Sequence, residues 1–181
     1  MNNVKEAWIE TYSGLRFYIL DPQPDQIQIE DIAHSLSLLC RFTGHVKHFY
    51  SVGQHSLVGS YLVPPQDALW FLLHDASEAF IGDMNRPLKH GTDAGDAYIP
   101  VELGIMRAIC NKFGLPEEEP KSVRLTDNAM LYAEKEQLMA PLVGDHDWGC
   151  STEAANVKLY EMMPREVEYL FLKRFRNLTH N

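Results

Sequence analysis

The spacing of hydrophobic residues changes early in the chain and predicts a small hairpin followed by helices. Residues 8–20 are rich in aromatic and β-branched side chains on both sides of a Ser-Gly pair, which predicts a β-hairpin. The proline-containing segment 21–25 ends it. Apolar residues then recur at helical spacing and predict a first helix that ends near Gly44. Its inward face would carry Ile32, Leu36, Leu39 and Cys40.

The bounds of the next two helices are predicted from residues that typically start or end a helix. Ser51 is the expected N-cap of a second helix, whose inward face would include His55. Pro64-Pro65 ends that helix and starts a third, which should run from about Gln66 to Ile81. The Gly-, Pro- and Asp-containing segment 82–97 is predicted to be a loop over the centre of the molecule.

Three more helices complete the prediction. A fourth should end at Gly114, a C-cap glycine followed by Leu-Pro, and a fifth should cover about 122–139. The fifth would place these side chains on one side: Val123, Asp127, Met130, Leu131 and Glu134. Pro164 suits the first turn of a last helix. We therefore predict one all-α domain over residues 1–181, with its core at about 26–140, a C-terminal helix at about 164–177 and a short N-terminal β-hairpin.

Composition and charge narrow the classes of protein. The chain has 181 residues, 45% of them hydrophobic, which suits one globular domain. A net charge of −9 argues against a nucleic-acid polymer as partner. No apolar run approaches the ~20 residues of a membrane span, and no signal peptide is visible. Cys40, Cys110 and Cys150 are too widely spaced for a disulfide framework or a CxxC zinc site, so we expect a cytoplasmic protein.

The third predicted helix carries the most informative cluster of ionisable residues. His74, Asp75 and Glu78 fall in one helical sector of an otherwise strongly apolar segment, 72–79. Burying these groups unpaired would cost several kcal/mol. A divalent cation would resolve this, because imidazole and carboxylate are natural ligands for first-row metals.

Further ligands must come from other helices, and His55 and Asp127 both fall on predicted inward faces. Taken singly, an inward His is usually a core residue and an inward Asp a cap or ion pair. Four such residues spread over three helices instead favour one metal site. The segment 145–147 (Asp-His-Asp) could also bind metal, although a surface turn is the simpler interpretation.

The set His55, His74-Asp75 and Asp127 resembles the HD-domain phosphohydrolases, an all-helical family in which these positions hold one divalent metal ion. The resemblance covers roughly residues 8–140. A set of short segments is similar to the branch containing bacterial 5′-deoxynucleotidases and phage dATP triphosphohydrolases. They are Arg41-Phe42, 51–56, 74–78, Gly82-Asp83 and 87–89.

This resemblance implies roles for individual residues. Glu78 and Asp83 would assist proton transfer, although which serves as acid and which as base is open. Arg41, Phe42 and Lys89 would bind the substrate, the two cations facing phosphate oxygens. The metal ion could be Co, Mn, Zn, Mg or Fe.

The resemblance also implies an activity. We expect hydrolysis of dATP or another dNTP to the deoxynucleoside and triphosphate; a dNMP 5′-nucleotidase and a non-catalytic nucleotide-sensing module are the alternatives. It further implies a homo-oligomer, with a hexamer first and a dimer second. The location would be the host cytoplasm if a phage encodes the protein. Candidates for apolar surface between subunits are Met162-Met163 and Leu170-Phe171-Leu172, with Leu172 pointing off the inward stripe.

Overall fold

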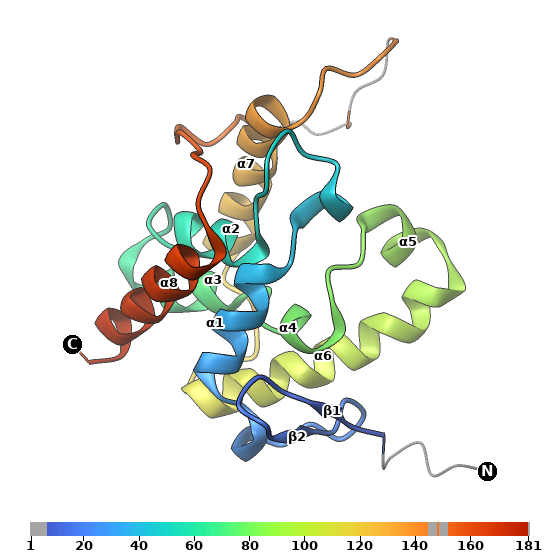
Figure 1. Ribbon diagram of the computed structural model, residues 1–181, viewed down its shortest axis with the longest axis vertical. Coiled ribbons are helices and arrows are strands. Elements are labelled where there is room, and N and C mark those ends of the chain that lie inside the picture. Colours follow the sequence, from blue (N-terminus) through green and yellow to red (C-terminus); the bar gives the residue numbers. More distant parts are fainter. Residues whose placement is uncertain (1–6, 145–147, 149–151, 181) are drawn as a thin grey trace.

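The computed structural model describes residues 7–144, 148 and 152–180, which form mostly helices and one two-stranded antiparallel sheet (Figure 1). The predicted hairpin is confirmed: strands β1 (Ile9–Glu10) and β2 (Arg16–Phe17) pair with Ile9 opposite Phe17. Phe17 is fully buried and stacks on Phe80, with ring centroids 3.9 Å apart. This contact anchors the hairpin to the helical part of the molecule.

The hairpin is followed by helices whose bounds are α1 (Ile29–Leu38), α2 (Val52–Gly59), α3 (Ala68–Leu73), α4 (Glu78–Ile81), α5 (Arg86–Gly91), α6 (Asp93–Phe113), α7 (Lys121–Leu138) and α8 (Pro164–Thr179). Short 3-10 turns are η2 (Pro24–Gln26), η3 (Arg41–Gly44) and η4 (Pro65–Asp67). None of these helices combines the length and apolarity needed to cross a bilayer, among the residues that the structure describes.

Helix α1 lies at the centre of the arrangement and packs against α2, α4 and α8, while α5 packs on α6 (Figure 1). Apolar side chains form two core clusters. The first joins the hairpin, α1, α6 and α8 around Leu36 and Phe171, and the second joins α3 and α7 around Phe71 and Met130. Helix α3 contributes to both clusters, so the residues that follow it lie where the two meet.

The first helix ends earlier than the sequence predicts, at Leu38 rather than near Gly44. Leu39 is extended, and Cys40 forms an antiparallel bridge with Ser51 instead of lying on the helix face. Backbone hydrogen bonds from Val52 to Leu39 and from Arg41 to Tyr50, both 2.9 Å, hold this bridge. A bridge to a residue eleven positions further along the chain thus overrides the local helical pattern.

The third predicted helix, 66–81, is not continuous. It divides into η4, α3, a turn at 74–77 and α4. Through this turn the backbone makes i→i−3 hydrogen bonds, from His74 to Phe71, Ala76 to Leu73 and Glu78 to Asp75. Such tightened turns place successive side chains at a larger angular step than an α-helix does.

The predicted loop 82–97 is wrong in part, because it contains α5 and the first turn of α6. Asn85 and Thr92 cap these helices, accepting backbone hydrogen bonds at 3.1 and 3.4 Å. Asparagine and threonine next to glycine and proline suit both loops and helix starts, which is why the pattern misled. The segment is therefore ordered by two short capping motifs.

The remaining boundaries follow the sequence closely. Ser51 caps α2 by accepting from the Gln54 amide at 3.0 Å, and Gly114 adopts the left-handed conformation after α6. Helix α7 lies within one residue of its prediction, and α8 begins at Pro164. On α8, Phe171 is fully buried, and Leu172 packs against the first core cluster rather than pointing away from it.

Candidate metal centre

The four predicted metal ligands come together from α2, the turn after α3, and α7. The Nε2 atom of His55 lies 3.2 Å from Nε2 of His74 and 3.2 Å from Oδ1 of Asp127. The Oδ2 atom of Asp75 lies 3.2 Å from Nε2 of His74. Ligand atoms of His55, His74 and Asp75 all lie within 4.8 Å of one another, a spacing that one metal ion can bridge.

Hydrogen bonds at the opposite ring nitrogens decide which atoms face the centre of this group. Nδ1 of His74 lies 2.7 Å from the Phe71 carbonyl oxygen, and Nδ1 of His55 lies 2.6 Å from Oε1 of Glu134. A carbonyl oxygen only accepts, so Nδ1 of His74 carries the hydrogen and donates it. The Glu134 carboxylate likewise accepts a hydrogen bond that Nδ1 of His55 donates. In the neutral rings, both Nε2 lone pairs then point inward together with two carboxylates, and a divalent cation fits this all-acceptor group.

The pKa values of His55 and Asp127 also indicate that a positive charge is favoured at this position. Burial and the charge of Arg41 disfavour protonation of His55, yet Glu134 and the hydrogen bond with Asp127 outweigh them and raise the pKa of His55 to about 9. Burial acts to raise the pKa of Asp127, but the hydrogen bond and charge of His55 lower it overall. Without a cation, a proton shared by His55 and Asp127 would occupy the position that the metal would take.

Glu134 is a residue of the site to which the sequence alone assigned no role. It is fully buried, and Oε2 lies 3.1 Å from Nη2 of Arg41 while Oε1 accepts from His55. Burial favours the neutral acid, but the charges of Arg41 and His55 prevail and lower the pKa of Glu134. One feature of the sequence could have identified Glu134 as a site residue. It follows Asp127 by seven residues, or two helical turns, and so lies on the same inward face of the helix.

Arg41, predicted to bind substrate phosphate, holds two carboxylates of the site. Its Nη1 atom lies 3.4 Å from Oδ2 of Asp75, in addition to its contact with Glu134, and its side chain is 12% exposed. It precedes Phe42 and Thr43, whose φ angles of 55° and 53° are unusual for residues other than glycine. Such strain costs of order 1–3 kcal/mol per residue and is found at functional sites.

A cavity of about 760 Å³ lies next to the candidate metal centre. This volume is typical of a small-molecule site. Seven of the predicted site residues line it: Arg41, Phe42, Asp75, Glu78, Asp83, Lys89 and Asp127. Trp148 also lines the cavity, with its ring centroid 5.9 Å from that of Phe42. Another tryptophan, Trp70, lies away from the cavity in the second core cluster. The alternative metal-binding segment 145–147 lies outside the described residues.

Two acids in the cavity have raised pKa values. Glu78 is buried, and its Oε2 atom has no hydrogen-bond partner among the residues that the structure describes. Burial together with the charges of Asp75 and Asp83 raises its pKa well above the usual value. Burial also raises the pKa of Asp83, where the charge of Arg41 opposes the shift. A carboxyl group with a raised pKa is a better candidate for transferring a proton in a reaction than one with an ordinary pKa.

Lys89 lines the cavity but already has an anionic partner. Its Nζ atom lies 2.6 Å from Oε2 of Glu102 on α6, and it lies 5.7 Å from the centre of the Tyr98 ring. These contacts link α5 to α6.

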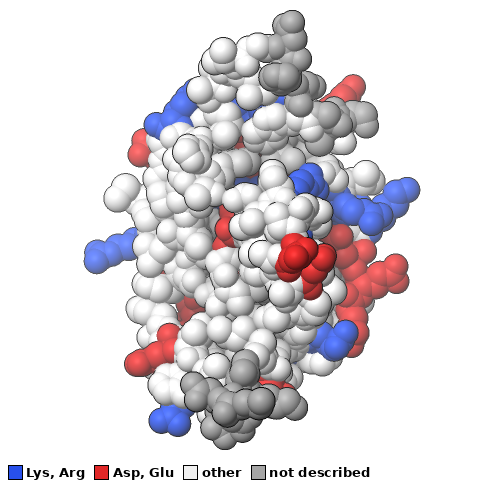
Figure 2. All heavy atoms as spheres, turned by 90° about the vertical axis from the view of Figure 1, so that its right-hand side faces the viewer, with Lys and Arg blue, Asp and Glu red and all other residues white. Residues whose placement is uncertain are grey.

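Figure 2 views the molecule from the side on which α5 lies in Figure 1, and charged side chains of both signs gather there at mid-height.

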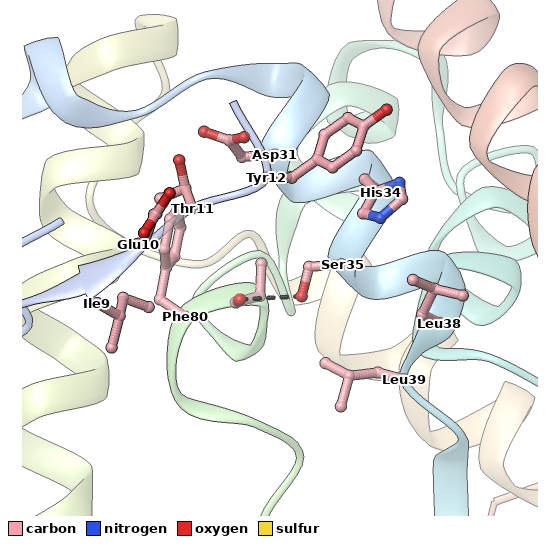
Figure 3. Close-up of a pocket in the computed structure, with 11 residues that line it drawn as sticks. Ile9, Glu10, Thr11, Tyr12, Asp31, His34, Ser35, Leu38, Leu39 and Phe80 are labelled. Atoms are coloured by element: carbon pink, nitrogen blue, oxygen red, sulfur yellow. Dashed lines mark hydrogen bonds between the residues drawn. The ribbon is translucent and has the colours of Figure 1, made fainter. Parts of the chain in front are cut away.

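A second cavity, of about 550 Å³, lies between the hairpin, α1 and α4 (Figure 3). Tyr12 stacks on His34 with ring centroids 3.6 Å apart, and Nδ1 of His34 lies 3.2 Å from Oε2 of Glu168. Asp31 accepts hydrogen bonds from the amide and hydroxyl of Ser13, at 2.6 and 2.8 Å. These polar groups thus have partners within the protein, and the contacts attach the hairpin to α1. His34 lines this cavity from α1.

Comparison of the sequence with known proteins places the chain in a family. No family model matches the chain. Over 178 residues, covering 96% of both chains, it is 38% identical to the uncharacterized protein YfdR of Escherichia coli (strain K12). Over 148 residues, covering 75% of this chain and 74% of the relative, it is 35% identical to the uncharacterized protein RCAP_rcc00048 of Rhodobacter capsulatus. Because the similarity to the first relative spans nearly the whole of both sequences, this chain belongs to the YfdR family.

Proposed function

We propose that this protein is an HD-type, metal-dependent phosphohydrolase that acts on deoxynucleotides. The observation that carries the proposal is the convergence of Nε2 of His55 and Nε2 of His74, 3.2 Å apart, with the carboxylates of Asp75 and Asp127. Ligand atoms of His55, His74 and Asp75 lie within 4.8 Å of one another, and Oδ1 of Asp127 lies 3.2 Å from Nε2 of His55. Such a group of acceptors suits one divalent ion. The sequence resemblance to HD-domain phosphohydrolases assigns the same four residues to that role.

The chemistry of the site suits transfer of a phosphoryl group to water. A bound divalent ion, whether Co, Mn, Zn, Mg or Fe, would supply Lewis-acid charge and activate water. Glu78 and Asp83, with their raised pKa values, would exchange protons with the attacking water and the leaving oxygen. Arg41 would hold Asp75 and Glu134 in place and face a phosphate oxygen from the same cavity.

The proposed substrate is a free deoxynucleotide rather than a nucleic-acid polymer. The cavity of about 760 Å³ suits one nucleotide, and the rings of Phe42 and Trp148 at its wall offer apolar surface for a base. We favour release of triphosphate and a deoxynucleoside from dATP or another dNTP. Cleavage of a dNMP by the same residues is the alternative.

We further propose that the protein works in the cytoplasm as a homo-oligomer formed by a single-domain chain, a hexamer in preference to a dimer. Exposed apolar side chains next to α8 support association: Tyr160 is 61% and Met163 69% exposed. Large apolar groups gathered on a surface favour a protein contact.

Product analysis tests the proposed activity. The purified protein would be incubated with dATP or dAMP in the presence of Mn, Co, Mg or Zn, and products separated by ion-exchange chromatography. Triphosphate and deoxyadenosine from dATP are expected, and the Asp127→Ala variant should yield neither. Phosphate release from dAMP alone would identify a 5′-nucleotidase instead. Binding without hydrolysis of any nucleotide would identify a nucleotide-sensing module.

A further inference from the structure

We infer that Arg86, at the start of α5, binds the phosphates of the substrate that lie beyond the one at the metal centre and so distinguishes triphosphate from monophosphate ligands. This inference rests on the proposed function. It follows from the distribution of charge around the cavity, from the attachment of α5 to α6, and from the chemistry of arginine.

The first step is to account for the cations that line the cavity. Arg41 is ion-paired with Asp75 and Glu134, at 3.4 and 3.1 Å, and Lys89 with Glu102 at 2.6 Å. Arg86 lines the same cavity and is exposed. Within residues 7–144, 148 and 152–180, its side chain has neither an ion pair nor a hydrogen bond. Its charge is therefore available to a ligand.

The second step concerns how firmly α5 is held. The Lys89–Glu102 ion pair joins α5 to α6, and the Thr92 hydroxyl donates to the Leu88 carbonyl oxygen at 2.8 Å. Gly95 packs so closely on the last turn of α5 that an added Cβ would overlap the Lys89 carbonyl. Lys89 is thus a positioning residue as well as a cavity residue, and it holds Arg86 on a fixed element. With the backbone of α5 held in this way, only the side chain of Arg86 loses conformational freedom on binding.

The third step is the chemistry of the ligand. A triphosphate carries more negative charge than a monophosphate, and the cavity wall around the metal centre is itself acidic, with Asp75, Glu78, Asp83 and Asp127. The metal ion and Arg41 would serve the phosphate that reacts. Further phosphates need another cation, and the planar guanidinium group of Arg86 can donate two parallel hydrogen bonds to phosphate oxygens. A monophosphate bound at the metal centre has no further phosphate for Arg86 to bind.

The test measures binding of two inorganic probes, so that its result does not depend on turnover. Isothermal titration of Mn-loaded protein with tripolyphosphate and with orthophosphate would compare Arg86→Gln, Arg86→Lys and wild type. Arg165→Gln is the matched control, since Arg165 is an exposed arginine on α8 that does not line the cavity. Circular dichroism and Mn content would be measured for each variant.

We expect Arg86→Gln to weaken tripolyphosphate binding by at least about 10-fold, the loss of hydrogen bonds to a charged group. Orthophosphate binding should change by less than about 3-fold, and Arg86→Lys should fall between wild type and Arg86→Gln. Equal weakening of both probes, an equal effect of Arg165→Gln, or no binding of tripolyphosphate by wild type would overturn the inference. If no deoxynucleotide is hydrolysed but tripolyphosphate binding still depends on Arg86, the proposed activity fails while this assignment stands.

Discussion

Nδ1 of His55 on α2 lies 2.6 Å from Oε1 of Glu134 on α7, and both side chains are completely buried. This contact fixes the ring so that Nε2 points toward His74 and Asp127. It also connects the two helices that carry the first and last of the predicted ligands. A carboxylate behind a ligating histidine increases the basicity of the ring and its affinity for metal.

Replacing Glu134 should therefore weaken metal binding without removing a ligand. We expect Glu134→Gln to lower affinity for Mn by about 10- to 100-fold, because the amide is a poorer partner for His55 and for Arg41. Titration calorimetry measures the affinity, and Glu136→Gln, an exposed position on the same helix, is the control. An unchanged affinity in a folded Glu134→Gln protein would show that this contact does not act on the metal.

Asp127 provides the most distant of the four predicted ligands. Asp127→Ala should lose bound metal and activity but keep its helicity, because its carboxylate is about one-third exposed. Metal content by plasma mass spectrometry and far-UV circular dichroism check this, with Asp25→Asn, an exposed substitution, as control. Normal metal content in Asp127→Ala would remove Asp127 from the ligand set.

Glu78 should make the metal-free protein less stable as pH rises. Burial and the charges of Asp75 and Asp83 raise its pKa above that of an unfolded carboxyl group. The folded state then binds more protons than the unfolded state, so the free energy of unfolding falls as pH increases through the folded pKa. Glu78→Gln removes this contribution and should show a smaller decrease between pH 5.5 and 8 in urea titrations with chelator.

The same substitution should lower kcat by about 10²- to 10⁴-fold if Glu78 transfers a proton. Glu117→Gln, at an exposed carboxylate that pairs with Arg107 on the surface, should change neither property. An identical pH profile for wild type and Glu78→Gln would indicate that Glu78 ionises normally in the fold.

Metal binding should stabilise the folded state because the ligands converge only there. At a free metal concentration 100 times Kd, the expected gain is about 2.7 kcal/mol of unfolding free energy. Differential scanning calorimetry with Mn and with excess chelator measures the shift in Tm. Asp127→Ala should show no shift, and an equal shift in both proteins would point to binding elsewhere.

The proposed homo-oligomer has a direct test in light scattering coupled to size exclusion. We expect a hexamer, or a dimer in second place, with Tyr160 and Met163 buried between subunits. Met163→Glu should then shift the distribution toward smaller species, because a charge would be buried at the contact. A single species of about 21 kDa at micromolar concentration, the mass of one chain, would contradict the proposal.

Much of the local structure follows from the sequence, because it depends on neighbours along the chain. The hairpin around Gly14, the Ser51 cap and the Gly114 stop each rest on properties of one or a few consecutive residues. The helical period also placed His55 and Asp127 on inward faces, and the structure brings these side chains together with His74 and Asp75.

Only the tertiary structure decided where long-range contacts end a helix and which charged side chains form ion pairs. The Cys40–Ser51 bridge ends α1. Arg41 and His55 both contact Glu134, and these three residues come from three separate segments. Periodicity shows which face of a helix is buried but not what lies opposite it. The charge balance of the cavity, in which Arg41 and Lys89 are paired and Arg86 is free among the described side chains, depends on distances across the fold. Because electrostatic and hydrogen-bond energies depend on those distances and on burial, a linear pattern cannot determine them.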